Sequence, residues 1–223
     1  MKNENTRLKE EISKLKEISQ EFKLFKEQIN TIIDERVKYL QQNEKEKEII
    51  SELNKSSILC GVDEKLFFQN LIKCQKLKLL YRLSRDGAEP SDFHRLCDYK
   101  GATLTLFKSQ NNRKFGGYLS KNWENSGDWK RDNNAFLFNI DLKKKYQLKN
   151  NRETSYYCNR DLGPIFQDFG FYCYKGGTLL DENKFMEYKL SNYYEVNKGY
   201  QKYEISGNDQ ISCKDIEVYQ IEF

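Results

Sequence analysis

The first 55 residues most constrain what this chain can fold into, because they follow a different pattern from the rest. Residues 1–55 contain no glycine, proline or tryptophan, and 12 basic side chains balance 12 acidic ones. Apolar side chains recur there at alternating spacings of three and four residues, which places them on one stripe of a helix. One seam position of these heptads holds Leu8, Leu15, Phe22 and Ile29, and the other holds Ile18, Phe25, Ile32 and Tyr39.

A single helix cannot bury such a stripe by itself. We therefore predict that residues 1–55 form a long helical coiled-coil arm. Residues 8–40 should contact a helical partner, either a second copy of the chain or another protein. Arg36 interrupts the first seam position, and Ile33, Val37 and Leu40 continue on a shifted stripe, as in a stutter or a weakening repeat. Bulky phenylalanines in the seam leave the number of paired helices open.

Residues 56–223 hold all the glycines and both prolines and are rich in β-forming residues. Asp63 is positioned to cap a helix that carries Phe67, Leu71 and Cys74. Pro90 opens a second short helix, with Phe93 and Cys97 on one face. Strands are predicted from Thr103 onward, with turns at residues 110–112 and 176–177; they are TLTLF, FGGYLS, AFLFNID, FGFYCY, YQKYEIS and DIEVYQIEF. Many short antiparallel strands with few helices favour a sandwich.

Composition excludes several other classes of protein. Aromatic residues make up 14% of the 223 residues, whereas disordered chains are poor in them. The net charge of +4, with no basic block longer than residues 143–145, does not indicate nucleic-acid binding. No apolar run approaches the length of a membrane span, and the amino terminus lacks the apolar stretch of a secretory signal. We expect a cytoplasmic protein, with the surface of an organelle or the cytoskeleton as a further place of residence.

The six cysteines form no CxxC pair. Without a secretory signal they are predicted to be reduced, buried thiols rather than a disulfide framework. His94 and Cys97 have a spacing that suits a metal, but no second pair completes a closed zinc site. We therefore predict no metal and no cofactor.

The stretch from Leu79 to Tyr118 carries a dense motif. It contains Tyr81-Arg82, Ser84-Arg85-Asp86-Gly87, Phe93-His94, Cys97-Asp98, Lys100-Gly101, Thr103-Leu104 and Phe115-Gly116-Gly117-Tyr118. These residues and spacings resemble the TLDc domain family. Further similar pieces are Trp123, residues 135–138, residues 163–166 and residues 217–219.

The resemblance implies a fold for residues 56–223. Two antiparallel sheets should pack face to face, with short helices at the edges. The whole chain is then an α+β protein that is mainly β, with the arm at residues 1–55 and the sandwich at residues 56–223. The residues that the family motif offers for binding are Arg85, Asp86, Gly87, His94, Asp98, Lys100, Gly116, Gly117 and Glu217.

A hydrolase would need a nucleophile, a base and an oxyanion donor within reach of one another. His94 is the only histidine in the chain. Its candidate nucleophiles are Ser84, Ser91 and Cys97, and its candidate orienting groups are Asp86, Asp92 and Asp98. No G-x-S-x-G elbow surrounds these serines.

Each motif residue also has a structural interpretation, which we favour. His94 is expected to be partly buried and to hydrogen-bond the turn at Asp86. Asp86 should accept hydrogen bonds from backbone amides and pair with Arg85 or Arg82, while Gly87 permits a positive φ. Gly116-Gly117 should allow close strand packing, and Glu217 is expected to point outward from its strand.

Three functions follow from these observations. The first is a non-enzymatic interaction module, which the resemblance links to oxidative-stress resistance and to binding and regulation of the vacuolar proton-pumping ATPase. The second is a structural adaptor in a cytoskeletal or ciliary assembly, anchored by the arm. The third is a hydrolase or redox enzyme that uses His94 with Ser84 or Cys97.

Overall fold

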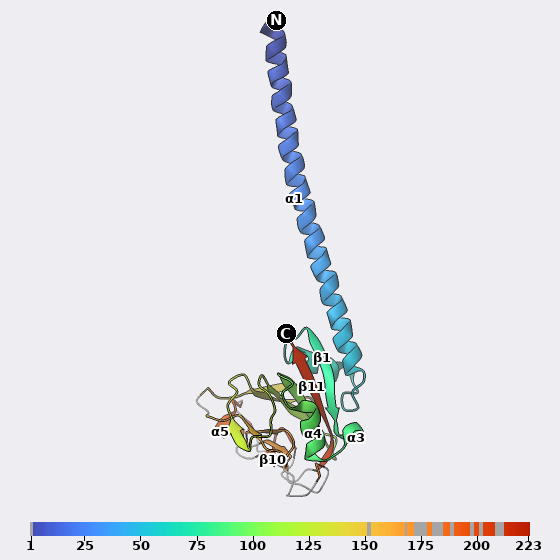
Figure 1. Ribbon diagram of the computed structural model, residues 1–223, viewed down its shortest axis with the longest axis vertical. Helices are drawn as coiled ribbons and strands as arrows, with labels where there is room; N and C mark the ends of the chain where they lie inside the picture. Colours follow the sequence, from blue (N-terminus) through green and yellow to red (C-terminus); the bar gives the residue numbers. More distant parts are fainter. Residues whose placement is uncertain are drawn as a thin grey trace. The chain divides into compact units, whose positions relative to one another are not determined.

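The computed structural model describes most of the chain (Figure 1). The described residues are 2–150, 153–167, 169–171, 178–179, 185–187, 190–196, 199–200, 203–207 and 212–223. They form two compact units, Met1–Lys47 and Glu48–Phe223.

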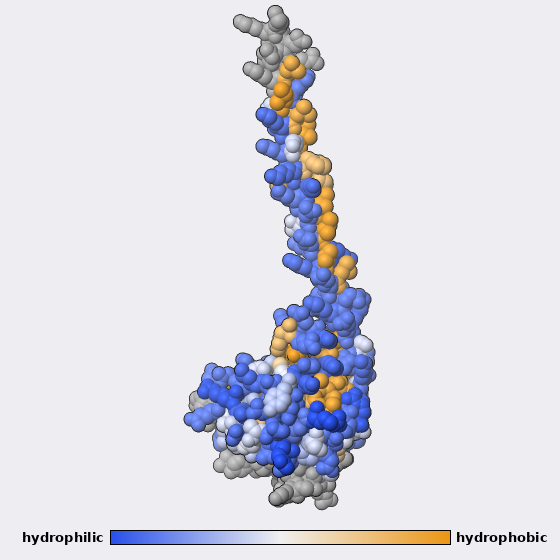
Figure 2. All heavy atoms as spheres, viewed as in Figure 1, coloured by the Kyte–Doolittle hydropathy of each residue, from blue (hydrophilic) through white to orange (hydrophobic). Residues whose placement is uncertain are grey.

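Helix α1 (Lys2–Leu53) is 52 residues long and confirms the predicted long helix. Its heptad side chains are exposed; Phe22, for example, exposes 68% of its surface and Ile32 64%. Figure 2 shows apolar residues following one side of this helix. No helix in the described residues combines the length and apolarity needed to cross a bilayer. The pairing of the arm with another helix stays a prediction.

Two antiparallel sheets form the second unit, which confirms the predicted sandwich class. In the described residues the larger sheet runs in the order β1 (Lys76–Arg82), β11 (Cys213–Glu222), β2 (Thr103–Ser109), β3 (Lys114–Leu119), β5 (Phe136–Asn139) and β6 (Lys144–Gln147). The smaller sheet runs β10 (Phe185–Glu187), β9 (Phe169–Phe171), β8 (Ile165–Phe166), β7 (Tyr156–Cys158) and β4 (Asp128–Lys130). The carboxy-terminal strand β11 thus lies inside the larger sheet, between β1 and β2.

The main core lies around Trp123, a residue that is 1% exposed. Its centroid lies 5.6 Å from each of Phe93, Tyr156 and Phe166, in edge-on contacts that aromatic rings prefer. The indole N–H donates to Thr103 Oγ1 at 3.0 Å, so the one polar atom of the ring is satisfied. Helix α4 (Pro90–Cys97) contributes Phe93 to this core, with its predicted partner Cys97 buried on the same face.

A second core covers the other side of the larger sheet. Phe68 of α2 (Val62–Asn70) packs edge-on against Tyr219 and Phe138, at 5.4 and 5.8 Å between centroids. Ile49 and Leu53, from the last turns of α1, are buried in the same cluster. These helices therefore cover a face of the sheet, whereas short helices were expected at its edges. The burial patterns agree with this, because successive residues of β11 and β2, which point to opposite faces of the sheet, are nearly all buried.

Several local predictions need correction. Glu64, not Asp63, receives the amides at the start of α2, from Cys60 and Gly61 at 3.0 and 3.2 Å. Residues 203–207 form turns rather than the predicted strand. Of the cysteines expected to be buried, Cys60 is exposed and Cys74 is half-buried, while Cys97, Cys158 and Cys213 are buried free thiols.

The turn at residues 110–112 joins β2 to β3 as predicted, with Asn112 at a φ of 61°. Of the predicted strand FGFYCY, residues 169–171 form β9. Its remainder (172–174), Cys173 and the predicted turn at 176–177 lie outside the described residues.

Candidate functional site

The motif begins where β1 ends in the single-turn helix α3 (Leu83–Asp86). The Asp86 carboxylate accepts from the Arg82 amide at 2.8 Å and from Arg85 Nε and Nη2 at 2.8 and 2.7 Å. This fork of two guanidinium hydrogen bonds lowers the pKa of Asp86. Gly87 follows at a φ of 115°, and a Cβ there would lie 2.1 Å from Asp92. The predicted pairing and the predicted need for glycine are both confirmed.

Glu217 is buried at the centre of a polar network and does not point outward, so that prediction is wrong. Its side chain is 0% exposed. Arg82 Nε donates to Oε1 at 2.8 Å, and the Ser57 amide donates to the same oxygen at 2.8 Å. The hydroxyls of Ser56 and Tyr219 donate to Oε2 at 2.6 and 2.9 Å. Every oxygen of this buried charge is therefore satisfied.

Asp215 extends this network along β11. Its carboxylate accepts from the hydroxyls of Ser57 and Ser84 at 2.7 and 2.8 Å, and from the Ser84 amide at 3.1 Å. Arg82 Nη2 also donates to the carbonyl of Lys55. We call the set Ser56, Ser57, Arg82, Ser84, Asp215, Glu217 and Tyr219 the β11 network. It ties the segment after α1 to the carboxy-terminal strand.

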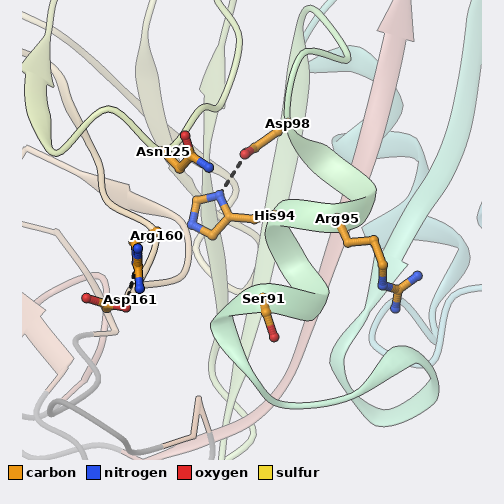
Figure 3. A pocket seen from close by; sticks show the side chains of 7 residues that line it. All are labelled: Ser91, His94, Arg95, Asp98, Asn125, Arg160 and Asp161. Carbon is orange, nitrogen blue, oxygen red and sulfur yellow. Dashed lines mark hydrogen bonds and ion pairs between the residues drawn. The ribbon is translucent and has the colours of Figure 1, made fainter.

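His94 lines a separate, open pocket of about 530 Å³ (Figure 3). The other residues around it are Ser91, Arg95, Asp98, Asn125, Arg160 and Asp161. The imidazole Nδ1 lies 2.8 Å from Asp98 Oδ1. Its Nε2 lies 2.9 and 3.0 Å from the carbonyls of Asn159 and Leu162. Both ring nitrogens thus face oxygen atoms of the protein.

The structure does not bring His94 to the turn that it was expected to support. Its partners are on its own helix and in the 159–162 loop, because its position in α4 directs the ring toward the smaller sheet's connections. Among the candidate nucleophiles, Ser84 donates to Asp215 instead. Burial raises the pKa of the Cys97 thiol far above its usual range, which opposes formation of a thiolate.

The paired glycines of β3 serve close packing, as predicted. A Cβ on Gly116 would lie 1.9 Å from the Thr105 carbonyl oxygen of β2. A Cβ on Gly117 would lie 2.5 Å from the Phe166 ring of the opposite sheet. Lys100 is exposed in the loop before β2, where its carbonyl accepts from Gln220 at 2.8 Å.

The motif residues therefore separate into two groups. Arg85, Asp86 and Gly87 lie next to the β11 network, whereas His94 and Asp98 line the pocket. Sequence reasoning missed Ser56, Ser57 and Asp215 altogether. A signal for them existed, since Asp215 and Glu217 alternate with the apolar residues Ile216 and Val218, and such carboxylates require partners if the strand is central.

No group of three or more His, Cys, Asp or Glu side chains within the described ranges could hold a metal ion. Comparison with curated proteins finds no match to this sequence. The family model of the TLDc domain matches residues 43–222, which is nearly all of the second compact unit. The chain belongs to the TLDc domain family.

Proposed function

We propose that this chain is a non-enzymatic protein-interaction module of the TLDc type. It acts in resistance to oxidative stress, in binding and regulating the vacuolar proton-pumping ATPase, or in both. The match to the family over residues 43–222 supports the class of module.

The observation that carries the non-enzymatic part is the bonding of His94. The chain's one imidazole is held by Asp98 and by two backbone carbonyls. A general base needs a free ring nitrogen within reach of the proton that it removes. Here Nδ1 and Nε2 are both engaged inside the protein, so the ring serves to join α4 to the 159–162 loop.

Contact with a partner requires motif residues that reach solvent. Arg85 exposes 47% of its side chain, and Lys100 is exposed. Asp86, Gly116, Gly117 and Glu217 are committed to internal bonds or packing. We propose that Arg85 and Lys100 contribute to the binding surface and that the buried motif residues maintain the fold beneath it.

The test is affinity purification of the full chain beside a chain that begins at Asn43, where the family match begins. Recovery of proton-pump subunits with both chains supports the proposal and assigns the contact to the TLDc domain. Recovery of tubulin-associated proteins, lost when the arm is removed, favours the cytoskeletal adaptor instead.

A surface variant sharpens this test. Lys100→Glu should reduce recovery of the partner, because it reverses a charge on the proposed surface. Lys121→Glu is the matched control, since Lys121 is an exposed lysine outside the motif. Equal recovery with both variants would remove Lys100 from the proposed surface.

A further inference from the structure

The apolar stripe of α1 contains two charged residues at seam positions. We call the arm seam the set Leu8, Glu11, Leu15, Ile18, Phe22, Phe25, Ile29, Ile32, Arg36 and Tyr39. Glu11 occupies the position one heptad before Ile18, and Arg36 the position one heptad after Ile29. All ten side chains are exposed on α1. Any helix that covers the arm seam must therefore meet one acidic and one basic group.

A second copy in parallel orientation would bring like charges together at these two positions. In a parallel pair in register, each seam residue faces its own counterpart. Glu11 would face Glu11 of the second copy, and Arg36 would face Arg36. Both contacts place like charges within an apolar seam, which is destabilising.

A second copy in antiparallel orientation can bring opposite charges together at these two positions. When Glu11 is placed opposite Arg36 of the second copy, two-fold symmetry creates the same contact twice. The remaining seam pairs are then all apolar: Leu8 with Tyr39, Leu15 with Ile32, Ile18 with Ile29, and Phe22 with Phe25 at the dyad. The two charged residues that interrupt the heptad pattern thus form ion pairs with each other across the interface.

Two pairs of residues beside the seam agree with this register, and a third places like charges at its outer edge. Lys14 comes opposite Glu35 of the second copy, again twice by symmetry, and Ile12 comes opposite Leu40. Lys26 faces Lys26 across the dyad at the outer flank, where long side chains reach into water. Ile12 and Leu40 are 52% and 51% exposed on the single helix, and this pairing covers both.

Neighbouring antiparallel registers lose the pairing of Glu11 with Arg36. A shift of one heptad in one direction places Arg36 opposite Ile18, and a shift in the other direction places Glu11 opposite Ile29. Either shift puts a charge against an aliphatic side chain. Charge complementarity therefore selects both the orientation and the register.

We propose that the arm seam is covered by a second copy of this chain in antiparallel orientation, with Glu11 of each copy against Arg36 of the other. The seam from Leu8 to Tyr39 extends over roughly 45 Å of helix at 1.5 Å per residue. This inference goes beyond the proposed function of the TLDc domain and does not depend on it.

Charge reversal in the full chain tests the proposal by sedimentation equilibrium. The unaltered chain should be a dimer. Glu11→Lys and Arg36→Glu should each raise the dissociation constant roughly tenfold, because two attractive contacts become repulsive. The double variant Glu11→Lys/Arg36→Glu should regain the original affinity. A monomeric unaltered chain, or single variants that associate as strongly as it does, would overturn the proposal.

Cross-linking tests the orientation directly. The arm contains no cysteine, and Cys60 is the exposed one among the described residues, so Cys60→Ser is introduced in every chain. Mixing a Glu11→Cys chain with an Arg36→Cys chain should give a disulfide-linked heterodimer under mild oxidation. Either variant alone should give little cross-linked product. Efficient cross-linking of Glu11→Cys to itself would show a parallel pair and refute the antiparallel register.

Discussion

Glu217 shows how one residue can join distant parts of this chain. Its carboxylate receives donors from β1, from the Ser56–Ser57 segment and from Tyr219 on its own strand. A fully buried carboxylate is costly unless such donors are present. Glu217 therefore adds a side-chain link between the family motif and the carboxy-terminal strand, beside the pairing of β1 with β11 and the bonds of Ser84 to Asp215.

We predict that Glu217→Ala lowers the free energy of unfolding by about 3 kcal/mol or more, because it leaves Arg82 Nε and three other donors without their acceptor. Arg82 is 17% exposed, so water cannot fully replace the lost partner. Urea unfolding followed by tryptophan fluorescence measures the change. Glu222→Ala is the control on the same strand; its ion pair with Lys76 is half exposed at 3.6 Å and should contribute less than about 1 kcal/mol. Equal effects of the two variants would contradict the role given to Glu217.

A second residue-scale prediction concerns His94. His94→Gln and Asp98→Asn remove the same hydrogen bond, so their effects on the free energy of unfolding should be less than additive. His94→Gln and Asp86→Asn should be additive, because the two residues share no hydrogen-bonding partner among those described. Each single variant should cost about 1 kcal/mol or somewhat more. Turnover of a substrate that vanishes in a folded His94→Gln protein would instead restore the enzyme hypothesis.

At the scale of elements, the sequence predicted those parts of the fold whose signals are local. The heptads of α1, the helix at Pro90, the hairpin between β2 and β3 and the paired glycines all follow from spacing or from single-residue chemistry. The pattern of short strands and the resemblance of residues 79–118 both predicted the sandwich. Both kinds of signal lie within short windows of sequence.

Contacts between parts of the chain that are far apart in sequence could not be predicted from such local signals. Alternation along the last strand made Glu217 look solvent-facing, because Ile216 and Val218 occupy the other face. That inference assumed that one face of the sheet is exposed to solvent. The second core, built by Phe68, Ile49 and Leu53, covers the face that alternation assigned to water. Which face of a strand is wet depends on helices that pack on it from more than 140 residues earlier in the chain.

The arm yields a prediction for a single element. Replacing Phe22, Phe25 and Ile29 together by glutamine should abolish association through α1, because these residues form the centre of its exposed stripe. The unfolding of the TLDc domain should be unchanged. Mass in solution, from light scattering or sedimentation, is the measurement.

Leu24→Gln is the matched control for that variant. Leu24 is an equally exposed apolar residue of α1, at 58%, but it lies outside the seam. Association should survive this change. Loss of association with Leu24→Gln, or its persistence in the triple variant, would contradict the assignment of the stripe.

For the whole molecule, the structure suggests where the arm can be removed without damage to the domain. The predicted boundary after residue 55 would remove Ile49 and Leu53, which are 4% and 0% exposed in the second core. The compact unit begins at Glu48 and the family match at residue 43. Residues 48–55 therefore belong with the sandwich in their packing, although they continue the helix of the arm.

We predict that a chain beginning at Asn43 unfolds with the same free energy as the domain in the full chain. A chain beginning at Ser56 should be less stable by about 4 kcal/mol or more, because it loses two buried aliphatic side chains and exposes the surface beneath them. Both tryptophans lie after residue 56, so one fluorescence signal reports on all three chains. Leu53→Ala in the full chain should reproduce part of this loss, whereas Leu40→Ala, on the exposed stripe, should leave the domain's unfolding unchanged. If the chains from Asn43 and Ser56 were equally stable, Ile49 and Leu53 would contribute nothing to the stability of the domain. The boundary between the arm and the domain would then lie after residue 55, as the sequence analysis predicts.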